Sequence, residues 1–271
     1  MIATTWFTFT VLGIAILMLI SAILLRHHQK LSFWLAFSIA IVMLLYKTTE
    51  FSYYRVIQNG MYPVEFSHVS YFVVSATLIS GVKKARFFGG FCAFASAIGY
   101  YVGAIFSPET TINTLTTWYI VVGIIQHNLL FFLGLVILFN LGLYEMKDIW
   151  ITFLGVALMI IYSILVYEKV IYPDSTGRNS MIIIDILNGS ILGYIMPIES
   201  VTLPLRIVTV VGLGVLLIVF ILISIKLNQV SYYARAKYFV KKGIPLYNFD
   251  PGLIYPLKKW YRKHQIKIYG N

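Results

Sequence analysis

The sequence predicts an all-α membrane protein, a polytopic bundle of about seven transmembrane helices. Apolar residues make up 59% of the 271 residues and only 11% are charged, and the mean hydropathy is +0.84. Several apolar runs reach the roughly 20 residues that a helix needs to cross about 30 Å of hydrocarbon. We therefore expect one membrane-embedded domain over residues 1–225, followed by a basic, aromatic-rich tail over residues 226–271.

Two apolar runs at the start of the chain predict the first two helices. Residues 6–25 lack the features of a signal peptide, so we expect them to remain as the first span. The solvated connector 26–30 separates them from the second span, 31–46. Lys47 and Glu50 continue this helix three residues apart, where an ion pair can form. A snorkelling lysine beside an interfacial acid explains the same residues, and both interpretations stay open.

The third and fourth spans are separated from the second by a polar, tyrosine-rich connector at residues 51–61. The third span is expected over residues 62–80, with Pro63 in its first turn, where the missing N–H costs nothing. Residues 87–106 form the fourth span. Its glycines are expected to let a neighbouring helix approach closely; they are Gly89, Gly90, Gly99 and Gly103.

The remaining spans are residues 118–143, 150–167 and 205–225. The apolar segment 181–196 is short and interrupted by polar residues, which suits a re-entrant segment better than a span. Most Lys and Arg residues fall after the first, third and fifth spans and in the tail 226–271. By the positive-inside rule, the amino end lies outside and the tail is cytoplasmic. We expect a multi-pass protein of the cell membrane.

Polar residues gather in two of these spans. Glu65, Ser67 and His68 open the third span, and Gln126, His127 and Asn128 lie in the middle of the fifth. Ionisable groups at membrane depth are costly and by default mark a functional site. We therefore expect the two spans to meet around one pocket. A structural hydrogen bond for His127 and an ordinary helix contact for Ser67 are the alternatives.

Several other classes of function find no support in the sequence. It contains no phosphate-binding glycine-rich loop, no CxxC, no HExxH and no GxSxG motif. His68 and His127 are too few to support a haem or metal site, so no cofactor and no metal are expected. The net charge of +11 reflects orientation in the membrane rather than nucleic-acid binding. The basic tail is expected to contact anionic lipid headgroups.

The motif order resembles the bacterial YwaF-type integral membrane family. The features that carry it are the charged end of the second span, the sequence PVEFS at residues 63–67, and His127 in the fifth span. This family is related to animal intramembrane lipid acyltransferases and to the androgen-induced hydrolases of fatty-acid esters. The resemblance covers residues 47–140 and implies lipid acyl transfer or ester hydrolysis. The family's usual nucleophile is a cysteine, and Ser67 stands at that position here.

The resemblance implies that Ser67 and His127 are catalytic. A hydroxyl ionises less readily than a thiol, so Ser67 needs His127 as a strong base. The expected binding residues are Glu65, His68, Gln126, Asn128, Lys47 and Glu50, and a membrane lipid is the expected substrate. Two alternatives remain: a proton-coupled transporter that uses these ionisable groups as a relay, and a membrane scaffold whose tail recruits a partner.

Overall fold

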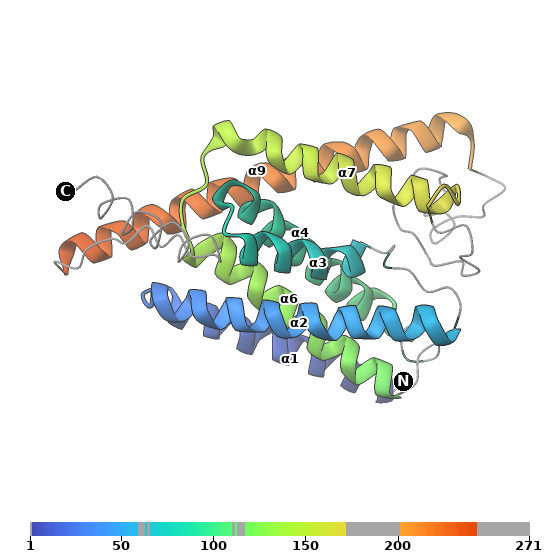
Figure 1. The fold of residues 1–271 in the computed structure, drawn as a ribbon, viewed down its shortest axis with the longest axis horizontal. Helices are drawn as coiled ribbons and strands as arrows, with labels where there is room; N and C mark the ends of the chain where they lie inside the picture. The colour runs from blue at the N-terminus through green and yellow to red at the C-terminus, as the bar shows by residue number, and fades with distance from the viewer. Residues whose placement is uncertain are drawn as a thin grey trace, which may run out of the picture.

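The computed structural model places the chain in a bundle of long helices (Figure 1). It describes residues 2–58, 63, 66–109, 112, 117–171 and 201–242. No strand occurs in this part of the chain, which confirms the predicted all-α class. The helices are α1 (Ile2–Leu25), α2 (Gln29–Gln58), α3 (Phe66–Ser80), α4 (Lys83–Phe106), α6 (Thr117–Asn140), the short 3-10 helix η1 (Met146–Asp148), α7 (Ile149–Tyr167) and α9 (Leu203–Lys241).

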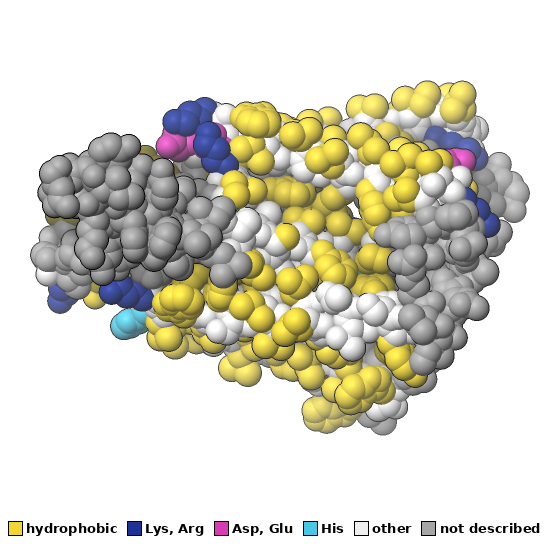
Figure 2. Space-filling view, in the orientation of Figure 1, with side chains coloured by type: hydrophobic (Ala, Val, Ile, Leu, Met, Phe, Trp, Pro, Cys, Tyr) yellow, Lys and Arg dark blue, Asp and Glu magenta, His cyan; other side chains and the backbone are white. Residues whose placement is uncertain are grey.

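Six of the described helices are long and apolar enough to cross a membrane: α1, α2, α4, α6, α7 together with η1, and α9. Helix α3 has 15 residues and rises about 22 Å, which is shorter than the hydrocarbon layer. Many large apolar side chains on the outer helices are exposed (Figure 2). Such a surface is stable in lipid and unstable in water. The protein is therefore a multi-pass membrane protein.

Helix α6 forms the centre of the bundle. It packs against α1, α2, α4 and α9, and every residue from Leu130 to Leu138 is buried. Helix α6 is therefore the element around which these helices pack. Helix α3 packs mainly on α2 and α4.

The boundary between α2 and α3 differs from the prediction. Helix α2 continues through the expected connector to Gln58, because Phe51 is buried against rings of α3 rather than exposed in a loop. Helix α3 begins at Phe66. Pro63 therefore precedes the helix instead of lying in its first turn, and its carbonyl accepts a hydrogen bond from Tyr162 Oη at 3.2 Å.

Helix α9 is longer than predicted. It has 39 residues and spans about 58 Å, so the first part of the expected tail, up to Lys241, is helical. Asn228 Nδ2 donates to Gly142 O at 3.0 Å, Asn228 Oδ1 accepts from Tyr144 N at 2.8 Å, and Arg235 donates to Asn140 O. These side chains bind backbone groups that the end of α6 leaves open, and so extend α9 along it. The predicted re-entrant segment 181–196 and residues 243–271 lie outside the described residues.

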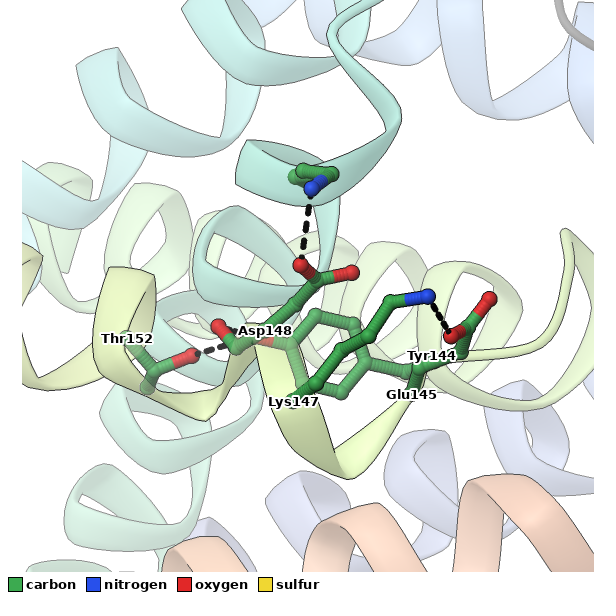
Figure 3. A network of polar contacts seen from close by, with 6 residues as sticks. Tyr144, Glu145, Lys147, Asp148 and Thr152 are labelled. Atoms are coloured by element: carbon green, nitrogen blue, oxygen red, sulfur yellow. Dashed lines mark hydrogen bonds and ion pairs between the residues drawn. The ribbon is translucent and has the colours of Figure 1, made fainter.

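A polar network joins the start of α4 to the connector between α6 and α7 (Figure 3). Lys84 Nζ lies 2.9 Å from Asp148 Oδ1. Tyr144 Oη donates to the Asp148 carbonyl at 2.5 Å and lies 3.3 Å from Thr152 Oγ1.

At the same end of the bundle, His27 stacks on Tyr238 of α9 at 3.9 Å. The basic connectors thus share one end of the bundle with the C-terminal part of α9, while the amino-end-outside orientation stays a prediction.

Candidate polar site between helices α2, α3, α4 and α6

Lys47 and Glu50 of α2 form an ion pair inside the bundle. Lys47 is 4% exposed, and its Nζ lies 2.6 Å from Glu50 Oε2. The predicted pair is confirmed, and the alternative of a lysine that snorkels to water is wrong. The ammonium also lies 4.6 Å from the centre of the Tyr71 ring of α3. Such a contact stabilises a desolvated cation through the negative face of the ring.

His127 of α6 is held by its backbone and by aromatic rings. Its Nδ1 lies 2.8 Å from Gly123 O, and because a carbonyl only accepts, Nδ1 carries the proton. In this tautomer Nε2 carries a lone pair and acts as an acceptor. The ring stacks on Tyr100 of α4 at 4.0 Å with an interplanar angle of 7°. It meets the Tyr71 ring edge-on at 6.2 Å.

Tyr71 of α3 therefore links Lys47 of α2 to His127 of α6. It touches both the Lys47 ammonium and the His127 ring. The predicted third and fifth spans meet through the ring contact of Tyr71 with His127, whereas a common pocket lined by Ser67, His68 and His127 stays a prediction. His68, on the same helix as Tyr71, packs edge-on against Phe51 of α2 at 5.1 Å. The Lys47 ammonium lies 5.9 Å from the centre of the same Phe51 ring.

A cavity of about 240 Å³ lies beside this cluster, between α2, α3 and α6. Its walls are almost entirely apolar and include Met43, Trp118 and Tyr71. Lys47 and Gln126 are the polar side chains that line it, besides the Tyr46 hydroxyl group. An apolar groove with a few placed polar groups is the usual form of a site for an amphiphilic ligand.

The other predicted residues have different positions. Ser67 is half-buried in α3, four residues before Tyr71 and so on the same helix face. Asn128 is buried, donates to Ile124 O at 2.8 Å and accepts from Tyr101 Oη at 3.0 Å. These bonds join α6 to α4, so the structure gives Asn128 a packing role. Glu65 lies outside the described residues.

The sequence did not single out Tyr71 and Tyr100, the two rings that contact His127. Because the chain contains 20 tyrosines, no single tyrosine stood out as a candidate site residue. A tyrosine in the middle of a predicted span, far from the interfacial belt, was the available signal. No group of three or more His, Cys, Asp or Glu side chains that could hold a metal occurs in the part of the chain that the structure describes.

The buried ion pair makes a testable contribution to stability. We expect Lys47→Met to lower the free energy of unfolding by about 3 kcal/mol, because it leaves the Glu50 carboxylate without its counter-charge inside the bundle. Unfolding in detergent, followed by circular dichroism, measures the change. Lys47→Met combined with Glu50→Gln should recover most of the loss.

The exposed pair Lys147–Glu145 provides the matched control for this prediction. Lys147→Met should change the stability by less than about 0.5 kcal/mol, since solvent screens an exposed pair. A double Lys47/Glu50 variant as unstable as Lys47→Met alone would show that the stabilisation comes from Lys47 packing and not from the pair.

No family model, no curated protein and no solved structure matches this chain, so the site is interpreted from its own geometry.

Proposed function

We propose that the protein binds a membrane lipid in the cavity beside Lys47 and acts on its acyl ester, by transfer or by hydrolysis. The observation that carries this proposal is the pairing of an apolar cavity with Lys47 and Gln126 in its wall. An acyl chain suits the apolar walls. The ester or phosphate oxygens of the lipid suit the positive charge of the Lys47 ammonium in the cavity wall.

The tautomer of His127 supports ester chemistry at this site. With Nδ1–H directed to Gly123 O, Nε2 is the ring atom that can accept a proton, as a general base requires. In the proposed step, Ser67 Oγ attacks the ester carbonyl carbon and its proton moves to His127 Nε2. The ester C–O bond then breaks, and the lipid alcohol takes that proton as it leaves. Water or a second alcohol finally removes the acyl group from Ser67.

The placement of Ser67 agrees with this role. Tyr71 touches the His127 ring, and Ser67 precedes Tyr71 by one helical turn on the same face of α3. The face of α3 that reaches His127 therefore also carries the proposed nucleophile. The resemblance of residues 47–140 to the YwaF-type family favours the same pair, with serine in place of the family's cysteine.

A proton-coupled carrier is the second candidate, and the buried Lys47–Glu50 pair favours it. Ionisable groups that pair inside a membrane bundle are typical of proton and ion pathways. Here Lys47 shares the Tyr71 ring with His127 and the Phe51 ring with His68. Such a cluster can pass protons between neighbouring groups without any acyl intermediate.

One preparation distinguishes the two functions. Purified protein is mixed in detergent with phospholipids that carry labelled acyl chains, and the same protein is reconstituted into vesicles that contain a pH-sensitive dye. We expect release or transfer of labelled acyl chains, with no protein-dependent proton flux. Proton flux without acyl turnover across several lipid classes would support the carrier and contradict the acyl-transfer proposal.

A further inference from the structure

A second cavity, of about 410 Å³, lies where the connector between α1 and α2 meets the C-terminal part of α9. Basic side chains line it from both elements: Arg26, His27, Arg235, Lys237 and Lys241. No acidic side chain of the described residues lines this cavity. The salt bridges in the described part of the chain involve other lysines, so the four cations of this cavity have no counter-charge there.

Arg235 is the buried member of this group. It is 3% exposed, and one of its nitrogens, Nη1, donates to Asn140 O. Its Nε and Nη2 atoms are buried and have no hydrogen-bond partner among the described residues. A guanidinium stays charged in proteins. Leaving two of its donors unsatisfied in a buried position is costly, which indicates that another group satisfies them.

His27 adds a third donor of the same kind. Arg26 Nε donates to His27 Nε2 at 2.8 Å, so the neutral ring carries its proton on Nδ1. This Nδ1 atom is buried without a hydrogen-bond partner in the described structure. Burial lowers the pKa of His27, and the charges of Arg26, His28 and Arg235 lower it further. The ring is fixed in place by stacking on Tyr238.

We propose that this cavity binds a phosphate group. Phosphate presents several acceptor oxygens and more than one negative charge, and it matches the unsatisfied N–H groups of Arg235 and His27 together with three further cations. A carboxylate has fewer oxygens and a single charge, and so satisfies this set less completely.

The position of the cavity suits two sources of phosphate. Arg26 directly follows Leu25, the last residue of the apolar helix α1, so the cavity lies at the depth of lipid headgroups. A phosphate group of an anionic phospholipid can reach it from the membrane, and a soluble phosphate compound can reach it from water. The site is separate from the proposed acyl site, because His127 lies about 20 Å along α6 from Asn140.

The test uses the full-length purified protein and measures both sources. In one arm, inorganic phosphate and pyrophosphate are titrated into protein in a non-ionic detergent by calorimetry. In the other, native mass spectrometry compares the retention of phosphatidylglycerol with that of phosphatidylcholine. We expect binding in at least one arm, and the responding arm identifies the source.

The variants avoid Arg235, because its bond to Asn140 O also holds α9 on α6. The cavity variant is Lys237→Gln with Lys241→Gln, both exposed residues. The control is Lys226→Gln with Lys242→Gln, which removes the same charge from exposed positions of the same segment that do not line the cavity. We expect the cavity variant to weaken binding about tenfold and the control less than about twofold.

His27→Phe gives a second measurement, because it keeps the aromatic stacking on Tyr238 and removes the Nδ1 donor together with the Nε2 atom that accepts from Arg26. It should weaken binding severalfold in the arm that responds. If the cavity variant and its control lose the same affinity, phosphate is attracted only by the overall positive charge of this segment. That result would overturn the proposal. Absence of phosphate binding in the first arm, together with no preference for phosphatidylglycerol in the second, would overturn it as well.

Discussion

His127→Ala should lower acyl-ester turnover by about a hundredfold to ten-thousandfold, the usual contribution of a positioned general base. The change removes the Nε2 acceptor of the tautomer that the bond from Nδ1 to Gly123 O selects. Ser67→Ala should cost as much or more, because it removes the group that carries the acyl chain. The double variant should lose little beyond the larger single loss, since the two residues act in one step. Labelled fatty acid released from phospholipid in detergent measures each rate.

Two controls separate chemistry from structure in this experiment. Ser67→Cys replaces the hydroxyl with a thiol that ionises more readily, and we expect it to keep or raise turnover. Tyr100→Phe preserves the ring that stacks on His127 and should leave turnover within about threefold of the wild type. Turnover that survives both Ser67→Ala and His127→Ala would exclude the proposed mechanism.

The helical fold and several helix ends could be predicted because they depend on local sequence. Apolar runs of sufficient length indicate the spans whatever their neighbours. The Lys47–Glu50 pair could be predicted for the same reason, since the two residues are one turn apart on a single helix. The structure adds the burial of Lys47, which depends on Tyr71 from another helix.

The length of α9 could not be predicted in this way. Residues 226–241 are polar enough to be taken for a soluble tail, and the helix continues there because Asn228 and Arg235 bind backbone groups near the end of α6. These partners lie far away in the sequence. The phosphate cavity was missed for the same reason, because Arg26 and Arg235 meet only after α1, α6 and α9 have packed.

Helical periodicity could have predicted which glycines of α4 face a neighbouring helix. All four were expected at a close helix contact, yet only two are. A Cβ on Gly89 or Gly90 would collide with Thr77 or Ile137, whereas Gly99 and Gly103 have nothing within 4 Å. Gly99 is nine residues beyond Gly90 and therefore about 180° around the helix, on the opposite face.

Gly134→Ala should destabilise the bundle more than any other glycine-to-alanine change at the α4–α6 contact. A Cβ on Gly134 would lie 2.7 Å from the backbone nitrogen of Phe94 and 2.9 Å from its Cα. Backbone atoms of a packed helix cannot rotate away as a side chain does, so α4 and α6 would have to separate. We expect a loss of about 1–3 kcal/mol in the free energy of unfolding, even though alanine favours helix more than glycine.

Gly99→Ala is the matched control, because Gly99 is helical and exposed, and the added methyl group meets no atom within 4 Å. It should leave the stability unchanged or raise it by up to about 1 kcal/mol, the difference in helix propensity between the two residues. Thermal unfolding in detergent, followed by circular dichroism, compares the two variants with the wild type. Equal melting temperatures for Gly134→Ala and Gly99→Ala would mean that α4 and α6 are not in close contact at Phe94. In that case the centre of the bundle would be packed more loosely than the structure indicates. The stacking of Tyr100 on His127 would then also be in doubt, because it depends on the same contact between α4 and α6.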